Sequence, residues 1–451
     1  MSRFDGKRLQ PEVFKLDVER MRQGWYSDKY FANIGVILAD LARREYRFDG
    51  VSPRLAHLGD RIRGIDTGNI EVEMQWFPRR RPFTVVAGVD KALAILRMCA
   101  GYFDDAGQFV STYDQLEVFA AHDGDVAPFS GDPMEVHPVL VVRGRYADLA
   151  TLETPMLGAL TRCSRIATNV YEVLEAARGK PVLFFPARFD AHEIQAGDGY
   201  AYRIAVQLYA ERHGREQQAF VSTDAQGDWW GGLGGGTVAH SFVACFLGDL
   251  SAAMLAFAET RPVAIPRIAL VDFNNDCIGD ATAVAAAMFA RCIEHYERGE
   301  MEMAERYRLH GVRLDTSGDI RDVSVPPVGQ PDLDFGVNPR LVFTMREALD
   351  GAWQSWSLPE RRLGPARDFC KAVQIVATGG FNAERIHLFE RLRVPVDIYG
   401  VGSCLLSNCG GCGTTTDLTA DVVRVKVGGK WHPMAKVGRQ ACWNSQLEPV
   451  S

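Results

Sequence analysis

One histidine stands between a run of glycines and an apolar helical pattern in the segment GGGTVAHS, residues 234 to 241. Glycines let the backbone come close to a ligand, and the free N–H groups at the start of a helix attract anions. Beside a bound anion, the imidazole of His240 can act as a nucleophile or as an acid. The segment is therefore a candidate phosphate site, although a helix-capping or packed histidine would give the same pattern.

Four later segments have the pattern of buried strands that end at acidic or glycine-rich tips. They are RIALVDFNND (267–276), GVRLDTSGD (311–319), KAVQIVATGGFN (371–382) and VPVDIYGVGS (394–403). Helical patterns such as TAVAAAMFARCIEHYERG lie between them. This repetition predicts parallel strands whose carboxyl ends gather on one face.

In an α/β barrel that face carries the chemistry, and the loops after the last two strands commonly hold phosphate. The tips ATGGFN and GVGS would form these two loops. Their glycines, Gly379, Gly380, Gly400 and Gly402, would let backbone N–H groups reach phosphate oxygens. The alternative is that these glycines only end strands, but two such tips in succession favour a phosphate site.

Together these motifs resemble those of the nicotinate phosphoribosyltransferases, which are type II phosphoribosyltransferases. GTVAHS, LVDFNND, GVRLDTSGD, TGGFN and DIYGVGS occur in the family's order and at similar spacing. Upstream, YSDKYF (26–31) resembles the family's TD-x-YF signature, with Ser27 where threonine is usual, and LETPMLGALTRCSRIATN (152–169) resembles its ET-x-x-LG…ATN segment. The resemblance spans about residues 26 to 423, and the joint pattern is specific.

The resemblance implies an ATP-coupled transfer of a phosphoribosyl group from phosphoribosyl pyrophosphate to nicotinate, giving nicotinate mononucleotide and pyrophosphate for NAD synthesis. His240 would accept a phosphoryl group from ATP, and Asp272 would hold the far nitrogen of its ring. A non-covalent role of His240 in binding pyrophosphate is the alternative. Asp315 would lie on the ribose and metal side of the site, where Mg²⁺ normally neutralises the departing pyrophosphate.

Further residues would contact the substrates. Arg313 lies two residues before Asp315 on one strand, so both side chains face the same way, and its guanidinium can grip the carboxylate of nicotinate. A structural ion pair between the two is the alternative. By resemblance, Tyr30 stacks on the pyridine ring, in relatives from the neighbouring subunit of a dimer. Arg188 aligns with the first of two family arginines near the phosphates, and Phe189 replaces the second. The remaining expected substrate contacts are Thr237, Thr378 and Ser403.

Three of the ten cysteines fall within nine residues of a glycine-rich loop, CLLSNCGGC. Cys404, Cys409 and Cys412 could form a tetrahedral zinc site together with Cys442 or His432. Some archaeal-type relatives carry a cysteine zinc site in their carboxy-terminal part, usually as paired cysteines. Free thiols are the alternative here. Six other cysteines stand singly in apolar patterns, which is typical of reduced core residues.

The expected fold class is α/β. We expect an irregular α/β barrel over residues 151–403, an N-terminal α+β sheet domain over 1–150 and a short C-terminal β-rich extension over 404–451. In that extension, TADVVRVKVGGKWHPMAKVG predicts two or three short strands around a GGK turn. The loop around 330–334 would be a mobile cover of the site or a plain surface loop. The resemblance implies a homodimer or a higher oligomer with shared active sites.

Composition limits the partners. The net charge is −7 with both signs interspersed along the chain, which argues against a nucleic-acid surface. The sequence has no apolar run that approaches a membrane span, and its polar start MSRFDGKRLQ lacks a signal core. We therefore expect a cytoplasmic protein that binds small molecules.

Two kinds of alternative function stay open. The same transfer to nicotinamide or quinolinate is the nearest, although quinolinate enzymes usually gather several basic residues for two carboxylates, and no such cluster is evident beside Arg313. A catalytically silent nucleotide sensor on the same scaffold is the other. The joint presence of His240, Asp272, Arg313 and Asp315 argues against the sensor, because a silent relative has no chemical need for all four.

Overall fold

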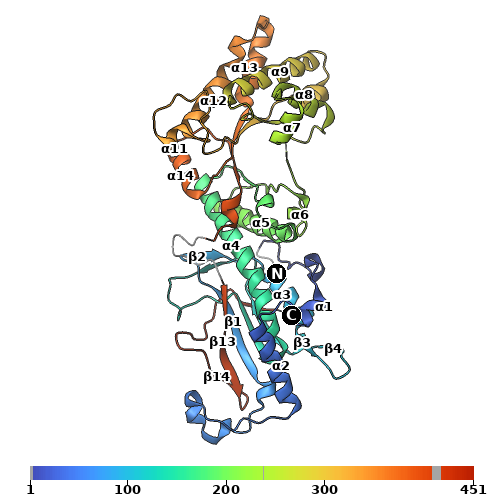
Figure 1. Cartoon of the computed structure of the whole chain (residues 1–451), viewed down its shortest axis with the longest axis vertical. Helices are drawn as coiled ribbons and strands as arrows, with labels where there is room; N and C mark the ends of the chain where they lie inside the picture. Colours follow the sequence, from blue (N-terminus) through green and yellow to red (C-terminus); the bar gives the residue numbers. More distant parts are fainter. Residues whose placement is uncertain (1–3, 237, 409–417, 451) are drawn as a thin grey trace.

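The structure is a computed structural model that describes residues 4–236, 238–408 and 418–450. The molecule is elongated, with an antiparallel sheet near one end and the helices α7 to α13 near the other (Figure 1). The long helix α4 (Glu153–Ala177) runs from beside the antiparallel sheet towards the middle of the molecule. No described helix combines the length and the apolar character that crossing a membrane requires.

The antiparallel sheet joins the two ends of the chain. Its strand order is β14-β13-β1-β7-β5-β15, so the strands after residue 417 pair with strands from the first 150 residues. Val422 on β13 faces Met74 on β1, for example, and a glycine turn connects β13 to β14, as the GGK motif predicts. The strands are β1 (Glu71–Pro78), β5 (Glu117–Ala120), β7 (Leu140–Arg145), β13 (Leu418–Val427), β14 (Lys430–Pro433) and β15 (Glu448–Pro449).

Shorter elements surround this sheet. Two small antiparallel pairs are β2 (Phe83–Val85) with β6 (Val126–Pro128), and β3 (Gly101–Phe103) with β4 (Phe109–Ser111). The helices of this part are α1 (Val18–Arg22), α2 (Lys29–Arg43) and α3 (Val89–Cys99). Apolar residues of α3, α4, β1 and β7 form one buried core between them.

A second sheet is parallel, with the strand order β8-β12-β11-β10-β9. Its strands are β8 (Val182–Phe184), β9 (Ile268–Leu270), β10 (Gly311–Leu314), β11 (Gln374–Ala377) and β12 (Ile398–Val401). Four of these five strands lie in the four segments that the sequence predicts, and helices separate them along the chain. The α/β class is therefore confirmed.

The connecting helices follow the strands in the order expected of α/β units. They are α5 (Gln195–His213), α6 (Asp224–Gly227), α7 (His240–Cys245), α8 (Leu250–Thr260), α9 (Cys277–Glu297), α10 (Met301–Arg306), α11 (Pro331–Asp334), α12 (Pro339–Gly351), α13 (Glu360–Ala372) and α14 (Ala383–Arg391).

Two isolated bridges continue the parallel sheet beyond β8. Phe184 pairs with Val221, and Val221 pairs with Gly234. Within the described residues the strand ladder does not close between Gly234 and β9, but the segments that follow these two ends meet where His240 contacts Asp272. The closed barrel stays a prediction, whereas the gathering of the strand tips at one place is observed.

Candidate active site

His240 is the first residue of α7, and its ring meets the tip of β9. The Nε2 atom lies 2.9 Å from Oδ2 of Asp272, two residues beyond the end of that strand. The histidine is partly exposed, whereas the side chain of Asp272 is only 8% exposed. The structure thus brings together the two residues that the family resemblance pairs, while their catalytic roles stay a prediction.

Asp272 is a buried carboxylate that is only half satisfied. Burial raises its pKa, the nearby charge of Asp315 raises it further, and the hydrogen bond to His240 opposes both effects. Its second oxygen, Oδ1, is buried and has no hydrogen-bond partner among the described residues. Buried polar atoms normally have partners, so an orphaned carboxylate oxygen at a strand tip indicates a place for a ligand or a cation.

Arg313 on β10 is also incompletely paired. Its Nη2 donates to the backbone carbonyl of Val238 at 3.2 Å, its guanidinium lies 6.0 Å from the ring of Phe185, and its buried Nε has no partner within the described residues. Burial lowers its pKa, and the charges of Asp315 and Asp272 oppose that effect. No ion pair within 4.0 Å joins Arg313 to Asp315 in the described part of the chain, so the structural ion pair is not formed.

Asp315 is held by the next strand. The hydroxyl of Thr378, just after β11, donates to Oδ1 of Asp315 at 2.7 Å and lies 2.8 Å from the carbonyl of Leu314. Gly379 and Gly380 follow with φ of +85° and +70°, a backbone conformation that favours glycine. This tip therefore has a fixed carboxylate on one side and a glycine turn on the other.

The two glycine tips expose backbone donors side by side. The N–H groups of residues 379–382 and of residues 402–404 donate to no other described group. The tips touch, because the thiol of Cys404 donates to the carbonyl of Phe381 at 3.1 Å. Successive free N–H groups form an anion-binding concavity, so the arrangement suits a phosphate, as the sequence predicts.

Gly400 and Gly402 are also needed for packing. A Cβ at Gly400 would lie 2.5 Å from the methyl of Thr378, and one at Gly402 would lie 2.7 Å from the ring of Phe189. Phe189, at the position where the family has a second arginine, therefore covers the tip of β12. The guanidinium of Arg188 lies 5.4 Å from that ring, and the charge of Arg188 also lowers the pKa of Arg313.

Tyr30 is not part of this cluster within one chain. It is 60% exposed on α2, its hydroxyl donates to Asp28 at 3.1 Å, and Asp28 in turn contacts Thr154 at the start of α4. Helix α4 has 25 residues and is about 37 Å long. Figure 1 shows α2 and α7 in opposite parts of the molecule.

Thr237, an expected substrate contact, lies outside the described residues.

The described residues do not bring the expected zinc ligands together. Two of them, Cys409 and Cys412, lie outside the described residues. Burial raises the pKa of Cys404 to about 11, and the thiol of Cys442 donates to the carbonyl of Met134 at 3.3 Å, in another part of the chain. His432 contacts His57 instead, and the described residues contain no group of three possible metal ligands. The zinc site stays a prediction that depends on the undescribed loop.

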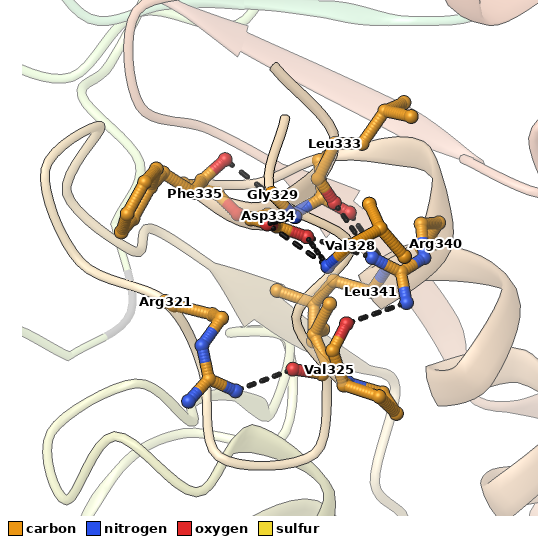
Figure 2. Close-up of polar contacts among 12 residues, drawn as sticks. Arg321, Val325, Val328, Gly329, Leu333, Asp334, Phe335, Arg340 and Leu341 are labelled. Carbon is orange, nitrogen blue, oxygen red and sulfur yellow. Dashed lines mark hydrogen bonds and ion pairs between the residues drawn. The ribbon is translucent and has the colours of Figure 1, made fainter. Parts of the chain in front are cut away.

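Sequence analysis missed the interactions that organise the segment 316–341. Asp334 accepts the N–H groups of Val328 and Gly329 and a bond from Arg340, which holds the loop against α12 (Figure 2). The sequence predicts either a mobile cover of the site or a plain surface loop around residues 330–334. In the structure, hydrogen bonds within the loop hold it in place. Arg385 was missed as well, although an arginine one turn after a glycine tip is a usable signal.

Comparison with known proteins is consistent with this geometry. No family model matches the chain. Nicotinate phosphoribosyltransferase pncB2 of Mycobacterium tuberculosis is 24% identical over 384 residues, covering 83% of this chain and 67% of that protein. Nicotinate phosphoribosyltransferase pncB1 of the same species is 26% identical over 299 residues, covering 60% and 63%.

Solved structures share the fold. The crystal structure of nicotinate-nucleotide pyrophosphorylase from Pyrococcus furiosus matches with a TM-score of 0.62 and 23% identity over 100% of this chain and 86% of that one. Human nicotinic acid phosphoribosyltransferase matches with a TM-score of 0.55 and 18% identity over 90% and 75%. The curated relatives and these structures together indicate an enzyme of the phosphoribosyltransferase type. In sequence, the chain is thus similar to two nicotinate phosphoribosyltransferases, at 24% and 26% identity.

Proposed function

We propose that this enzyme transfers the phosphoribosyl group of phosphoribosyl pyrophosphate to nicotinate, giving nicotinate mononucleotide and pyrophosphate for NAD synthesis. The observation that carries the proposal is the buried guanidinium of Arg313, which has an unpaired Nε and no carboxylate partner among the described side chains. A buried charge without a partner is costly, and the carboxylate of nicotinate would supply one. The names of the two mycobacterial relatives support the same substrate.

The remaining groups suit the rest of the reaction. The free N–H groups at 379–382 and 402–404 would hold the phosphates of the donor. Asp315, fixed by Thr378, would stabilise the positive charge that develops on the ribosyl carbon as pyrophosphate leaves. The bond from that carbon to the pyrophosphate oxygen breaks, and the ring nitrogen of nicotinate forms the new bond with its own electron pair.

Magnesium fits the same place. Asp272 offers a buried oxygen without a described partner, and Asp315 lies close enough for its charge to raise the pKa of Asp272. Carboxylate oxygens are the ligands that Mg²⁺ prefers, and these two aspartates would hold it. When bound, the ion would neutralise charge on the departing pyrophosphate.

ATP coupling through His240 is the second part of the proposal. A carboxylate at Nε2 favours the proton on that nitrogen, so the lone pair of Nδ1 is free to attack the γ-phosphorus of ATP. The bond from the γ-phosphorus to the bridging oxygen breaks, and ADP leaves. Hydrolysis of the phosphohistidine then returns phosphate and the free imidazole.

Product analysis tests the transfer. Purified enzyme is incubated with phosphoribosyl pyrophosphate, Mg²⁺ and nicotinate, nicotinamide or quinolinate, with and without ATP. We expect nicotinate mononucleotide as the main product and more of it with ATP. A larger yield from nicotinamide or from quinolinate would reassign the substrate, and no product from any pyridine would favour a nucleotide sensor.

Labelling tests the phosphohistidine. Incubation with ATP labelled at the γ-phosphate should leave an acid-labile, base-stable phosphate on the protein, and His240→Ala should remove it. If the label persists in the variant, another residue carries the phosphate. If no label forms although ATP stimulates transfer, His240 acts without covalent chemistry.

We also propose a dimer with shared active sites. The N-terminal part exposes four large apolar side chains on and just before α2, those of Trp25, Tyr30, Val36 and Ile37. Tyr30 lies away from His240 within one chain, so a second subunit would have to place it over the pyridine. Mixing Tyr30→Ala with Asp315→Asn, which should each have reduced turnover alone, should restore part of the activity, because mixed dimers contain one intact site. No restoration would contradict shared sites.

Zinc in the loop that begins at Cys404 remains part of the proposal. Elemental analysis of enzyme purified without added metal should find near-stoichiometric zinc. Absence of zinc would mean that the cysteines of this loop are free thiols.

A further inference from the structure

Arg385 connects two loops at the face where the strand tips gather. It lies in the first turn of α14, and its Nη1 donates to the carbonyl of Gly379 at 2.9 Å and lies 3.5 Å from that of Gly380. Its Nη2 donates to the carbonyl of Val337 at 2.8 Å. The guanidinium packs 4.6 Å from the ring of Phe381 and is largely buried, which lowers its pKa.

These bonds set the direction of the neighbouring donors. In a trans peptide the C=O and the following N–H point in opposite directions. Because the carbonyl of Gly379 points at Arg385, the N–H of Gly380 points away from it. The carbonyl of Gly380 also faces the guanidinium, at 3.5 Å, so the N–H of Phe381 points away from Arg385 as well. Both N–H groups belong to the unpaired set at 379–382.

Glycine alone would not hold this orientation. Gly379 and Gly380 both have positive φ, and glycine has the largest choice of backbone conformations. Arg385 forms no ion pair with a described carboxylate, and its guanidinium lies 4.6 Å from the ring of Phe381 and 6.0 Å from that of Phe389, so its bonds to the backbone select one of those conformations. The guanidinium therefore acts on the backbone, not on a ligand.

The second bond reaches the segment that Figure 2 shows. Val337 follows Gly336, whose N–H donates to the carbonyl of Ile320, and Asp334 with Arg340 fastens the part of the loop between them. Arg385 thus joins the glycine tip of β11 to the loop after β10. Arg340 holds the same loop, and its hydrogen bonds within the described residues go to Leu333, Asp334 and Pro326, not to the glycine tip.

We propose that Arg385 is a positioning residue that orients the Gly379–Gly380 backbone, so that its N–H groups face a phosphate of the ribosyl donor. The ligand class is a phosphomonoester on a ribose, and the inference rests on the proposed function for the identity of that donor. Without Arg385 the N–H groups are still present, but they are no longer aimed at one point.

Arg385→Gln tests this, with Arg340→Gln as the matched control that loosens the loop alone. Binding of ribose 5-phosphate is measured by calorimetry, and KM is measured for phosphoribosyl pyrophosphate and for nicotinate. A released glycine backbone must be ordered again when the ligand binds, and ordering about one residue weakens binding about tenfold. We expect that weakening, and a similar rise in KM for the donor, in Arg385→Gln, with KM for nicotinate nearly unchanged. Arg340→Gln should bind ribose 5-phosphate as the wild type does.

Equal losses in both variants would assign the effect to the loop and overturn the inference, as would unchanged binding in Arg385→Gln. If Arg385→Gln does not fold, Arg385→Lys replaces it: lysine keeps the charge, but its single nitrogen cannot replace the two nitrogens that bond separate loops, so ribose 5-phosphate should again bind more weakly. Wild-type binding of ribose 5-phosphate without pyridine nucleotide formation would contradict the proposed function and leave the role of Arg385 standing. Normal turnover of the variant with unchanged binding of ribose 5-phosphate would overturn the role of Arg385 and leave the proposed function unaffected.

Discussion

The antiparallel sheet and the tips of the parallel sheet differ in how completely their charged side chains are hydrogen-bonded. In the antiparallel sheet, Glu73 on β1 is buried, and its carboxylate accepts bonds from Arg143 at 2.7 Å and Arg424 at 2.9 Å. At the strand tips, the side chain of Asp272 is buried and Arg313 is partly buried, yet each keeps a buried polar atom without a described partner.

The difference separates charges that stabilise the fold from charges that await a ligand. Paired and hydrogen-bonded groups can be buried at little cost, whereas an orphaned charge reduces stability until something binds it. Perturbed pKa values at the tips have the same cause, because burial there is not compensated. If this distinction holds, substitutions in the antiparallel sheet should mainly lower the free energy of unfolding. Substitutions at the strand tips should mainly lower turnover or change substrate choice.

The largest effect is expected for Asp315→Asn. Removing the carboxylate charge beside the ribosyl carbon should lower kcat about 10²- to 10³-fold. The melting temperature should change little, because asparagine keeps an acceptor for Thr378. Steady-state assays and thermal melts check this. Asp368→Asn, at an exposed site on α13, is the control and should keep wild-type turnover.

Arg313→Ala should change substrate choice. The charge-assisted pair with nicotinate is worth about 1.5–3 kcal/mol, and the neutral amide of nicotinamide gains much less. The ratio of kcat/KM for nicotinate over nicotinamide should therefore fall about ten- to a hundredfold. Arg313→Lys should retain part of the ratio, since it keeps the charge. Equal losses for both substrates would make Arg313 a structural or phosphate contact.

Glu73→Gln tests the other region. Two arginines would lose a charged partner but remain partly exposed, so we expect the free energy of unfolding to fall by about 1–2 kcal/mol in urea denaturation. Turnover per folded molecule should be unchanged. Glu117→Gln removes an exposed partner of Arg143 and should cost about 0.5 kcal/mol or less. A loss of kcat in Glu73→Gln would break the comparison.

The smallest effect is a pH dependence of stability at Asp272. Folding raises the pKa of this carboxyl, so the unfolded chain ionises first, and wild-type stability falls as pH rises above about 3.9, the usual value for aspartate. Asp272→Asn cannot ionise. Its melting temperature relative to the wild type should therefore rise between about pH 4 and pH 5.5, below the usual titration of histidine. A constant difference in melting temperature between Asp272→Asn and the wild type across this range would contradict the uncompensated burial of the Asp272 carboxylate.

Local patterns were enough to predict much of the site. The strands β9 to β12 and their tips follow from apolar runs that end in acidic or glycine-rich motifs, whereas the contact between His240 and Asp272 was implied by the family resemblance. Parallel strands bring such tips together by their topology. The resemblance to a family added roles that the residues alone could not supply.

Other features depend on contacts between distant parts of the chain. The pairing of β13 with β1 joins residues about 350 positions apart, and no motif in either strand indicates its partner. The position of Arg385 after a glycine tip is a usable signal, but the sequence does not indicate that its guanidinium donates to the backbone carbonyls of two loops. The loop 316–341 is fastened by Asp334 in a turn where proline and acidic residues alone suggested only exposure.

Hydrogen–deuterium exchange tests most directly whether the strand tips await a ligand. The amides of residues 379–382 and 402–404 have no described acceptor, so they should exchange quickly in the free enzyme. Phosphoribosyl pyrophosphate with Mg²⁺ should slow exchange in both segments and leave the amides of β1, β7 and β13 unchanged. Protection confined to other segments, or none at either tip with the donor bound, would contradict the assignment of this face as the phosphate site.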